Sequence, residues 1–322
     1  MTVTVTAPTR RGPASTDVTA IARDYGVYAA LVIVLAYNAV FTDGFITGDN
    51  LRVQLIQVVP VLLVALGMAL VIGTQGIDLS VGAVMAVAAA VVPLYLGYGF
   101  VPAVLAALFC GALIGLVNGS MVAFVGLQPI VATLALMIAG RGIALVISDE
   151  QMKSVDNAQM LALGIGSVAG VPYTVAVAAV ITLAMVVLVS RTTYGRQLVA
   201  IGGNRRAAEL AGLPVRRILV TTYIVCAVLS AVAGIIVTAR SGASVPSTIG
   251  NLIELSAITA VVIGGTPLSG GQVRIIGTVA GALLIQTIIA TLSQHNVPPS
   301  YSSIVQALII VIAIYIQRGR ST

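Results

Sequence analysis

Long apolar segments separated by short polar stretches make up most of the chain. An apolar run of about 20 residues is long enough to cross a bilayer as an α-helix. The pattern predicts an all-α polytopic membrane protein with about ten transmembrane or re-entrant helices. The predicted segments lie near 25–41, 51–72, 79–96, 101–117, 126–150, 173–189, 218–239, 252–264, 273–292 and 302–316.

The composition agrees with a membrane protein. Hydrophobic residues make up 59% of the chain, charged residues 8%, and the mean hydropathy is +1.10. A soluble globular domain carries about a quarter charged residues, so that class is excluded. The net charge of +6 does not indicate a nucleic-acid partner. The basic residues gather in the two tails and one central loop, as signals of membrane orientation do.

The central loop 191–217 fixes the predicted orientation. It holds six of the 16 basic residues, against the single carboxylate of Glu209. Positive loops stay in the cytoplasm, so this loop, the tail 1–24 and the tail 318–322 are predicted to be cytoplasmic. The net negative stretch 148–172 is then external, and 25–317 forms the membrane domain.

Within this loop, the sequence predicts a glycine turn followed by a short amphipathic helix at 205–213. Small side chains on such a helix allow close approach to the groove of a partner. The alternative is a solvated loop that only holds the membrane orientation. The predicted contact residues are Gly202, Gly203, Asn204, Arg205, Ala207, Ala208, Ala211 and Gly212.

Two interrupted helices echo each other, ALVIGTQGIDLSVG at 69–82 and AVVIGGTPLSGG at 260–271. Paired breaks of this kind in two related halves mark a transport pathway. The predicted crossings make the two copies parallel. Asp78 or Ser80 can cap the next helix, and for Asp78 capping is favoured over substrate contact. The predicted break or gate residues are Gly73, Gly76, Asp78, Ser80, Gly264, Gly265, Pro267 and Gly270.

Few polar side chains lie within or beside the apolar segments, and these could offer hydrogen bonds to a polar solute. Arg141 either faces the pathway or extends towards Asp149 and Glu150 at the membrane surface. Glu254 either faces the pathway or stabilises a helix N-terminus. The candidate pathway residues are Asn118, Gln128, Thr133, Arg141 and Glu254.

An enzymatic function is not indicated. The one lysine, Lys153, is not part of a GxxxxGK[ST] phosphate-binding loop, so the chain has no ATPase of that type. The one histidine, His295, excludes a multi-histidine metal cluster, and Cys110 and Cys226 lie in apolar runs. No metal and no cofactor in this chain are predicted.

Four stretches, 67–86, 127–145, 195–213 and 252–271, closely resemble the permease subunits of bacterial monosaccharide importers of the ATP-binding-cassette class. The resemblance covers nearly all of 51–317. The stretch LQPIVATLALMIAGRGIAL at 127–145 is most similar to the galactofuranose branch of the ribose, xylose and arabinose group.

This resemblance implies a type II importer fold with inverted halves in the bacterial inner membrane, which conflicts with the parallel copies above. It implies three partners besides membrane lipid: a second permease in a homodimer or paralogous heterodimer, a cytoplasmic ATPase that uses ATP and Mg, and a periplasmic or lipid-anchored sugar-binding protein. The segment 202–212 resembles the coupling helix that docks on the ATPase. The substrate is expected to be a monosaccharide.

Two other functions remain open from the residues alone. An ion-coupled secondary transporter of a small polar solute would use Asp78 or Glu254 to couple to protons or sodium. A passive channel would need neither. Neither alternative explains the short helix predicted in the central loop.

Overall fold

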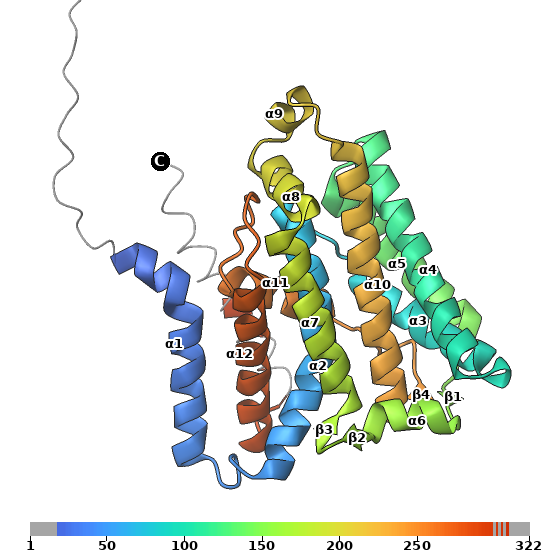
Figure 1. Cartoon of the computed structure of the whole chain (residues 1–322). Helices are drawn as coiled ribbons and strands as arrows, with labels where there is room; N and C mark the ends of the chain where they lie inside the picture. Colours follow the sequence, from blue (N-terminus) through green and yellow to red (C-terminus); the bar gives the residue numbers. More distant parts are fainter. Residues whose placement is uncertain (1–17, 299–300, 302–303, 305–306, 309–322) are drawn as a thin grey trace, which may run out of the picture.

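The computed structural model describes residues 18–298, 301, 304 and 307–308, and they form a bundle of helices (Figure 1). Seven helical segments in this described part are long and apolar enough to cross a membrane. The long helices are α1 (Val18–Phe41), α2 (Gly48–Gly73), α3 (Val81–Tyr95), α4 (Phe100–Ser120), α5 (Pro129–Ser148), α7 (Tyr173–Arg191), α10 (Val215–Ser241) and α12 (Ile275–Gln294).

Each of the first nine predicted segments contains a helix, which confirms the all-α membrane fold. The eighth is the short helix α11 (Ile253–Ile263). The tenth, 302–316, and the tail 318–322 lie largely outside the described residues. The helix α1 begins at Val18, so the predicted tail 1–24 overlaps the first helix.

The helix α2 lies at the centre of the bundle. Its side chains are buried almost without interruption from Val58 to Gly73, and it packs against α10, α11, α12 and α7. Polar pairs add to this packing: Gln286 of α12 donates to Gln57 of α2 at 2.9 Å. By contrast α4, α5 and α7 bury little of their surface and expose apolar side chains, as helices that face lipid or a partner do.

The helix α4 packs along α10 through a stripe of small residues, four positions apart. Small side chains at this spacing let two helix backbones approach closely within a membrane. A Cβ on Gly115 would lie 2.7 Å from the Ile224 Cα and the Tyr223 carbonyl oxygen. The stripe consists of Ala103, Ala107, Gly111, Gly115 and Gly119.

Two helices begin next to each other after stretches that are not helical. The stretch 74–80 leads from α2 into α3, and 245–252 leads from α10 into α11. The two helices begin side by side, because a Cβ on Gly82 would overlap the Gly250 carbonyl oxygen. The two stretches reach this point from opposite ends of the bundle, which is the arrangement that inverted repeats produce.

The two breaks that share a sequence pattern are a different pair. The breaks after Gly73 and after Gly264 lie at the same end of the bundle, where the amide N–H of Gly271 donates to the carbonyl oxygen of Gly73 at 3.0 Å. Their similarity reflects two helix ends that meet. The stretch that meets the start of α3 is 245–252, whose sequence does not resemble 74–80.

The two ends of the bundle carry different structures (Figure 1). At one end lie two small antiparallel ladders and α6 (Ala158–Ile165), which is part of the stretch 148–172 that is predicted to be external. At the other end lie α8 (Thr193–Gly203) and α9 (Arg205–Leu210). The ladders pair β1 (Lys153–Ser154) with β4 (Ala243–Ser244) and β2 (Ser167–Val168) with β3 (Val171–Pro172).

The contact between α4 and α10 can be tested with alanine. We expect Gly115→Ala to lower the free energy of unfolding by about 1–3 kcal/mol, because its methyl group meets the backbone of α10. Gly142→Ala on α5 is the matched control, since no atom lies within 4 Å of the added Cβ. Thermal unfolding of the purified protein in detergent measures both. Equal midpoints for the two variants would show that this contact is not tight.

Candidate functional site

A chain of hydrogen bonds holds the break after α2. The carboxyl oxygen Oδ1 of Asp78 accepts from the Ser80 amide at 2.9 Å and from the Ser80 hydroxyl at 2.7 Å. The side-chain amide of Asn118 on α4 donates to that hydroxyl at 2.7 Å. All three side chains are fully buried. Asp78 therefore holds Ser80, the residue that precedes α3, but neither Asp78 nor Ser80 accepts from an amide of α3 itself, so the predicted side-chain cap is not formed.

Thr133 of α5 supports the same break from the other side. Its hydroxyl oxygen accepts from the Leu79 amide at 3.1 Å, and the hydroxyl donates to the Pro129 carbonyl at 2.9 Å. Gln128 stands apart from this network, exposed at the N-cap of α5. Asn118 and Thr133, predicted as pathway residues, thus bond to the backbone or side chains of the break.

Arg141 and Glu254 lie where α3 and α11 begin. Arg141 Nη1 donates to the Ile249 carbonyl at 2.7 Å and to the Pro246 carbonyl at 3.4 Å. Its guanidinium is therefore directed at the break before α11, and not towards Asp149 and Glu150, the alternative that the sequence left open.

Glu254 occupies the first turn of α11. Its Oε2 and the Nη2 of Arg141 lie 3.1 and 3.2 Å from the position of a Cβ on Gly82, in the first turn of α3. The carboxylate thus lies at the N-termini of two helices and beside a cation, and all three stabilise negative charge. Both side chains are half-buried. Two of the predicted pathway residues thus come together here, as Asn118 and Thr133 do at the break after α2.

Glycines bring α8 into contact with the breaks after Gly73 and after Gly264, which lie at the same end of the bundle. A Cβ on Gly202 would overlap the Gly73 carbonyl oxygen, and one on Gly270 would lie 3.0 Å from the Gly202 carbonyl oxygen. Gln75 Nε2 donates to that Gly202 oxygen at 2.9 Å. The segments 73–76, 202–203 and 270–271 therefore form one contact, which we call the glycine junction. Gly264 makes a similar approach to Gly277 where α11 meets α12.

The helix α9 begins directly beyond the glycine junction. Gly202 and Gly203 are the last residues of α8, so the predicted turn at 202–204 is wrong. The side chain of Asn204 caps α9 by accepting from the Ala207 amide at 2.9 Å. After α9, Gly212 has a φ of +74°, a conformation that glycine adopts without strain.

The two faces of α9 differ in exposure. Ala208 is only 5% exposed and packs on the rest of the chain, so it does not lie on the outer face expected for a partner contact. Leu210 is 81% exposed, and sequence reasoning passed over it. The sequence does contain an indication of this exposure, because Leu210 is the one large apolar side chain in a short polar helix and would be expected to contact an apolar partner. Arg205 and Glu209 pair at 3.3 Å on the exposed surface.

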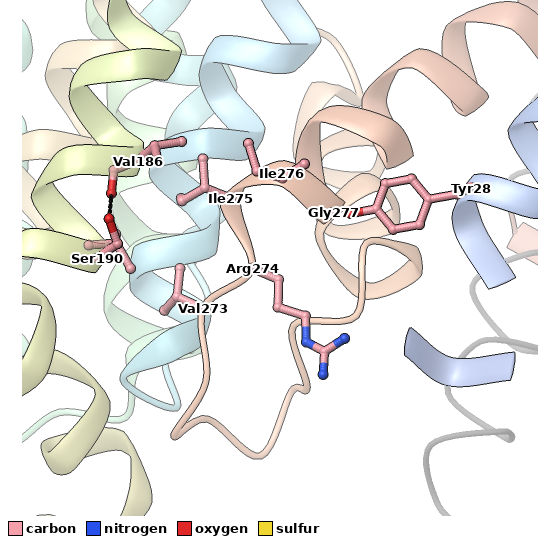
Figure 2. A pocket seen from close by; sticks show the side chains of 9 residues that line it. Tyr28, Val186, Ser190, Val273, Arg274, Ile275, Ile276 and Gly277 are labelled. Carbon is pink, nitrogen blue, oxygen red and sulfur yellow. Dashed lines mark hydrogen bonds between the residues drawn. The ribbon is translucent and has the colours of Figure 1, made fainter. Parts of the chain in front are cut away.

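A cavity of about 300 Å³ lies between α1, α7 and the start of α12 (Figure 2). Its lining is mostly valine and isoleucine, with Tyr28, Ser190 and Arg274 as the polar members. The hydroxyl of Ser190 donates to the carbonyl of Val186 on its own helix at 2.6 Å. None of the five predicted pathway residues lines this cavity, so it is separate from the candidate pathway.

Residues 51–314 match the family described as the permease component of the branched-chain amino acid transport system. The chain belongs to this family. The galactofuranose transporter permease protein YtfT of Escherichia coli K12 is 39% identical to this chain over 286 residues, which cover 88% of this chain and 84% of that protein. No solved structure matches the chain.

Two further relatives are also named for sugars. The ribose import permease protein RbsC of Escherichia coli K12 is 38% identical over 297 residues, 90% of this chain and 92% of that protein. The fructose import permease protein FruF of Bifidobacterium longum is 37% identical over 260 residues, 78% of this chain and 73% of that protein. The predicted resemblance of the permease to the subunits of monosaccharide importers is confirmed.

The glycine junction can be tested by two neighbouring substitutions in the permease. Gly202→Ala places a methyl group against the Gly73 carbonyl, so we expect it to displace α8 and to abolish transport. Gly203→Ala is the control, because no atom lies within 4 Å of its Cβ. Uptake in reconstituted vesicles and the amount of inserted protein measure the effect. Normal uptake with Gly202→Ala would contradict the tight contact.

The contribution of Arg141 to stability can be tested by a substitution and a second substitution that compensates for it. We expect Arg141→Gln to lower the thermal midpoint, because the Ile249 carbonyl loses its bond and Glu254 loses its neighbouring cation. An unpaired buried acceptor costs about 1–3 kcal/mol, and more for a charged group. Adding Glu254→Gln should restore part of the loss by removing the charge. If it restores nothing, Arg141 stabilises the bundle only through the two carbonyls.

Proposed function

We propose that the permease is the membrane subunit of an ATP-binding-cassette importer that brings a monosaccharide into the cell. The sugar names of the relatives support this substrate class. The structural observation that carries the proposal is the position of α9. It is an exposed helix at one end of the bundle, one residue beyond a junction that contacts two helix breaks.

In this proposal, α9 docks in a groove of the ATPase. Leu210 inserts as the apolar anchor, while Arg205 and Arg206 face acidic groups at the rim. Ala207, Ala211 and Gly212, all exposed, permit close approach. Ala208 lies on the opposite face of α9, where it packs the helix against the rest of the permease. Gly202 belongs to the glycine junction, through which a displacement of α8 reaches the ends of α2 and the 264–274 loop.

The sugar pathway runs past the region where α3 and α11 begin. Apolar side chains cannot replace the water that a sugar loses on entering the membrane, so hydrogen-bonding groups are needed there. Arg141 supplies donors and Glu254 supplies acceptors. The exposed apolar faces of α4 and α5 offer a surface for the second permease subunit, a second copy or a paralogue.

The proposed orientation places the α8–α9 end in the cytoplasm, where the arginines of 191–217 hold it. The α6 end then faces outside and receives the periplasmic or lipid-anchored sugar-binding protein. ATP and Mg are used by the partner ATPase. The orientation is tested by placing a cysteine at position 204 and adding a membrane-impermeant thiol reagent to whole cells. Labelling of this cysteine would show that the orientation is the opposite of the one proposed.

Reconstitution tests the function. The permease, co-purified with its ATPase, is placed in vesicles with the sugar-binding protein on one side. We expect accumulation of a radiolabelled monosaccharide that requires hydrolysable ATP and persists without any ion gradient. Accumulation driven by a sodium or proton gradient in the absence of ATP would identify the alternative, a secondary transporter.

The proposed docking role of Leu210 can be tested by a single substitution. Leu210→Asp places a charge where an apolar contact is proposed, so we expect at least a tenfold weaker binding of the ATPase, about 1.4 kcal/mol. Leu210 is exposed, so the variant should insert and fold normally. Leu210→Met is the conservative control and should bind almost normally. Unchanged ATPase binding by Leu210→Asp would show that α9 is not the docking element.

A further inference from the structure

At the break after α2, three buried polar atoms make none of the described hydrogen bonds, although the Asp78 carboxyl also lies beside the Cys226 thiol, which is only a weak donor. They are Oδ2 of Asp78, Oδ1 of Asn118 and the hydroxyl of Tyr223. Each of the three side chains is fully buried. A buried polar atom without a partner costs about 1–3 kcal/mol, so three in one region call for an explanation.

The hydrogen bonds around Asn118 determine which of its side-chain atoms has no partner. The Ser80 hydroxyl donates its one proton to Asp78, so it can only accept from Asn118. The donating atom of Asn118 must therefore be its nitrogen, which leaves its oxygen as the free acceptor. The carboxyl oxygen Oδ2 of Asp78 is a second free acceptor, and the Tyr223 hydroxyl is a free donor.

The three side chains surround the same short segment. The Tyr223 hydroxyl oxygen lies 2.7 Å from the position of a Cβ on Gly76, two residues before Asp78. The Tyr223 Cβ lies 3.3 Å from the position of a Cβ on Gly119, the residue next to Asn118. Tyr223 of α10, Asn118 of α4 and the break at 76–80 thus meet in the interior of the bundle.

We propose that Asp78, Asn118 and Tyr223 together bind one water molecule. A water molecule donates two hydrogen bonds and accepts up to two, and buried waters in proteins typically make about three. This water donates to Asp78 Oδ2 and Asn118 Oδ1 and accepts from the Tyr223 hydroxyl. All three atoms are then paired. A metal cation would coordinate the two acceptors but leave the Tyr223 proton without an acceptor.

The water ties the break to α4 and α10 at once. Gly76 is required beside it, because a side chain there would displace the Tyr223 hydroxyl. The bound water also completes the support of Asp78, whose other oxygen holds the residue that precedes α3. The site therefore positions the start of α3, and with it Gly82, against Gly250.

A structure of the assembled permease at a resolution that shows ordered water tests the site directly. We expect density within about 2.5–3.0 Å of the three atoms. A direct hydrogen bond between Tyr223 and Asp78, with no density between them, would overturn the proposal.

A double-substitution cycle tests the site in solution. Tyr223→Phe and Asn118→Ala each remove one partner of the water, and these two side chains share no direct hydrogen bond among those described. We expect the double variant to lose less thermal stability than the sum of the two single losses, because the first substitution already weakens the water. Additive losses would overturn the proposal.

Two controls make the cycle specific. Tyr223→Phe combined with Thr259→Val should be additive, since the Thr259 hydroxyl bonds to Leu255 within α11. The thermal midpoint of the unsubstituted permease should be the same in sodium, potassium and choline chloride at equal ionic strength. A midpoint raised by sodium alone, and lost with Asn118→Ala, would replace the water with a bound cation.

Discussion

The structure depends on one requirement, that backbone N–H and C=O groups within a membrane must find partners inside the protein. Two stretches, the mostly buried 74–80 and the partly exposed 245–252, leave the helical pattern and so lose the partners that a helix supplies. Side chains from neighbouring elements replace those partners. Thr133 accepts from the Leu79 amide, Asp78 accepts from the Ser80 amide, and Arg141 donates to the Ile249 carbonyl. The scarce polar residues of this chain are concentrated where the helices are broken.

Close approach between backbones is the second requirement, and glycine provides it. At the glycine junction, backbone atoms of the end of α2, the end of α8 and the loop before α12 approach one another closely, and the Gln75 side chain bonds across the contact. Close-packed contacts of this kind transmit a displacement from one element to the next. A movement of α8 would therefore act on the end of α2 and on the 264–274 loop together. This rigid path is what makes the position of α9 relevant to the breaks.

The sequence predicts the helices within the membrane domain well, because most are long apolar runs, and it predicts the breaks from glycine, proline and aspartate within such runs. It did not predict the short helices α6 and α8. It could not predict which breaks meet. The Ile249 carbonyl that binds Arg141 lies 108 residues away, and a carbonyl has no signature in the sequence. The glycines at 202 and 203 fit a helix end as well as a turn, so the end of α8 was missed. For the six-residue helix α9, composition alone did not show that Ala208 faces inward and Leu210 outward.

The same requirement separates structural from substrate-binding roles among the candidate pathway residues. Asn118 and Thr133 are fully buried and direct hydrogen bonds at the break, so neither side chain is open to a passing solute. Arg141 has five N–H donors and gives both of its described hydrogen bonds from Nη1. Glu254 is an acceptor that lies half-exposed beside it. A sugar hydroxyl both donates and accepts, so a donor-only and an acceptor-only group side by side match it. A residue can therefore hold a broken helix and still present a partner to the substrate, provided that, like Arg141, it has more donors than the backbone uses.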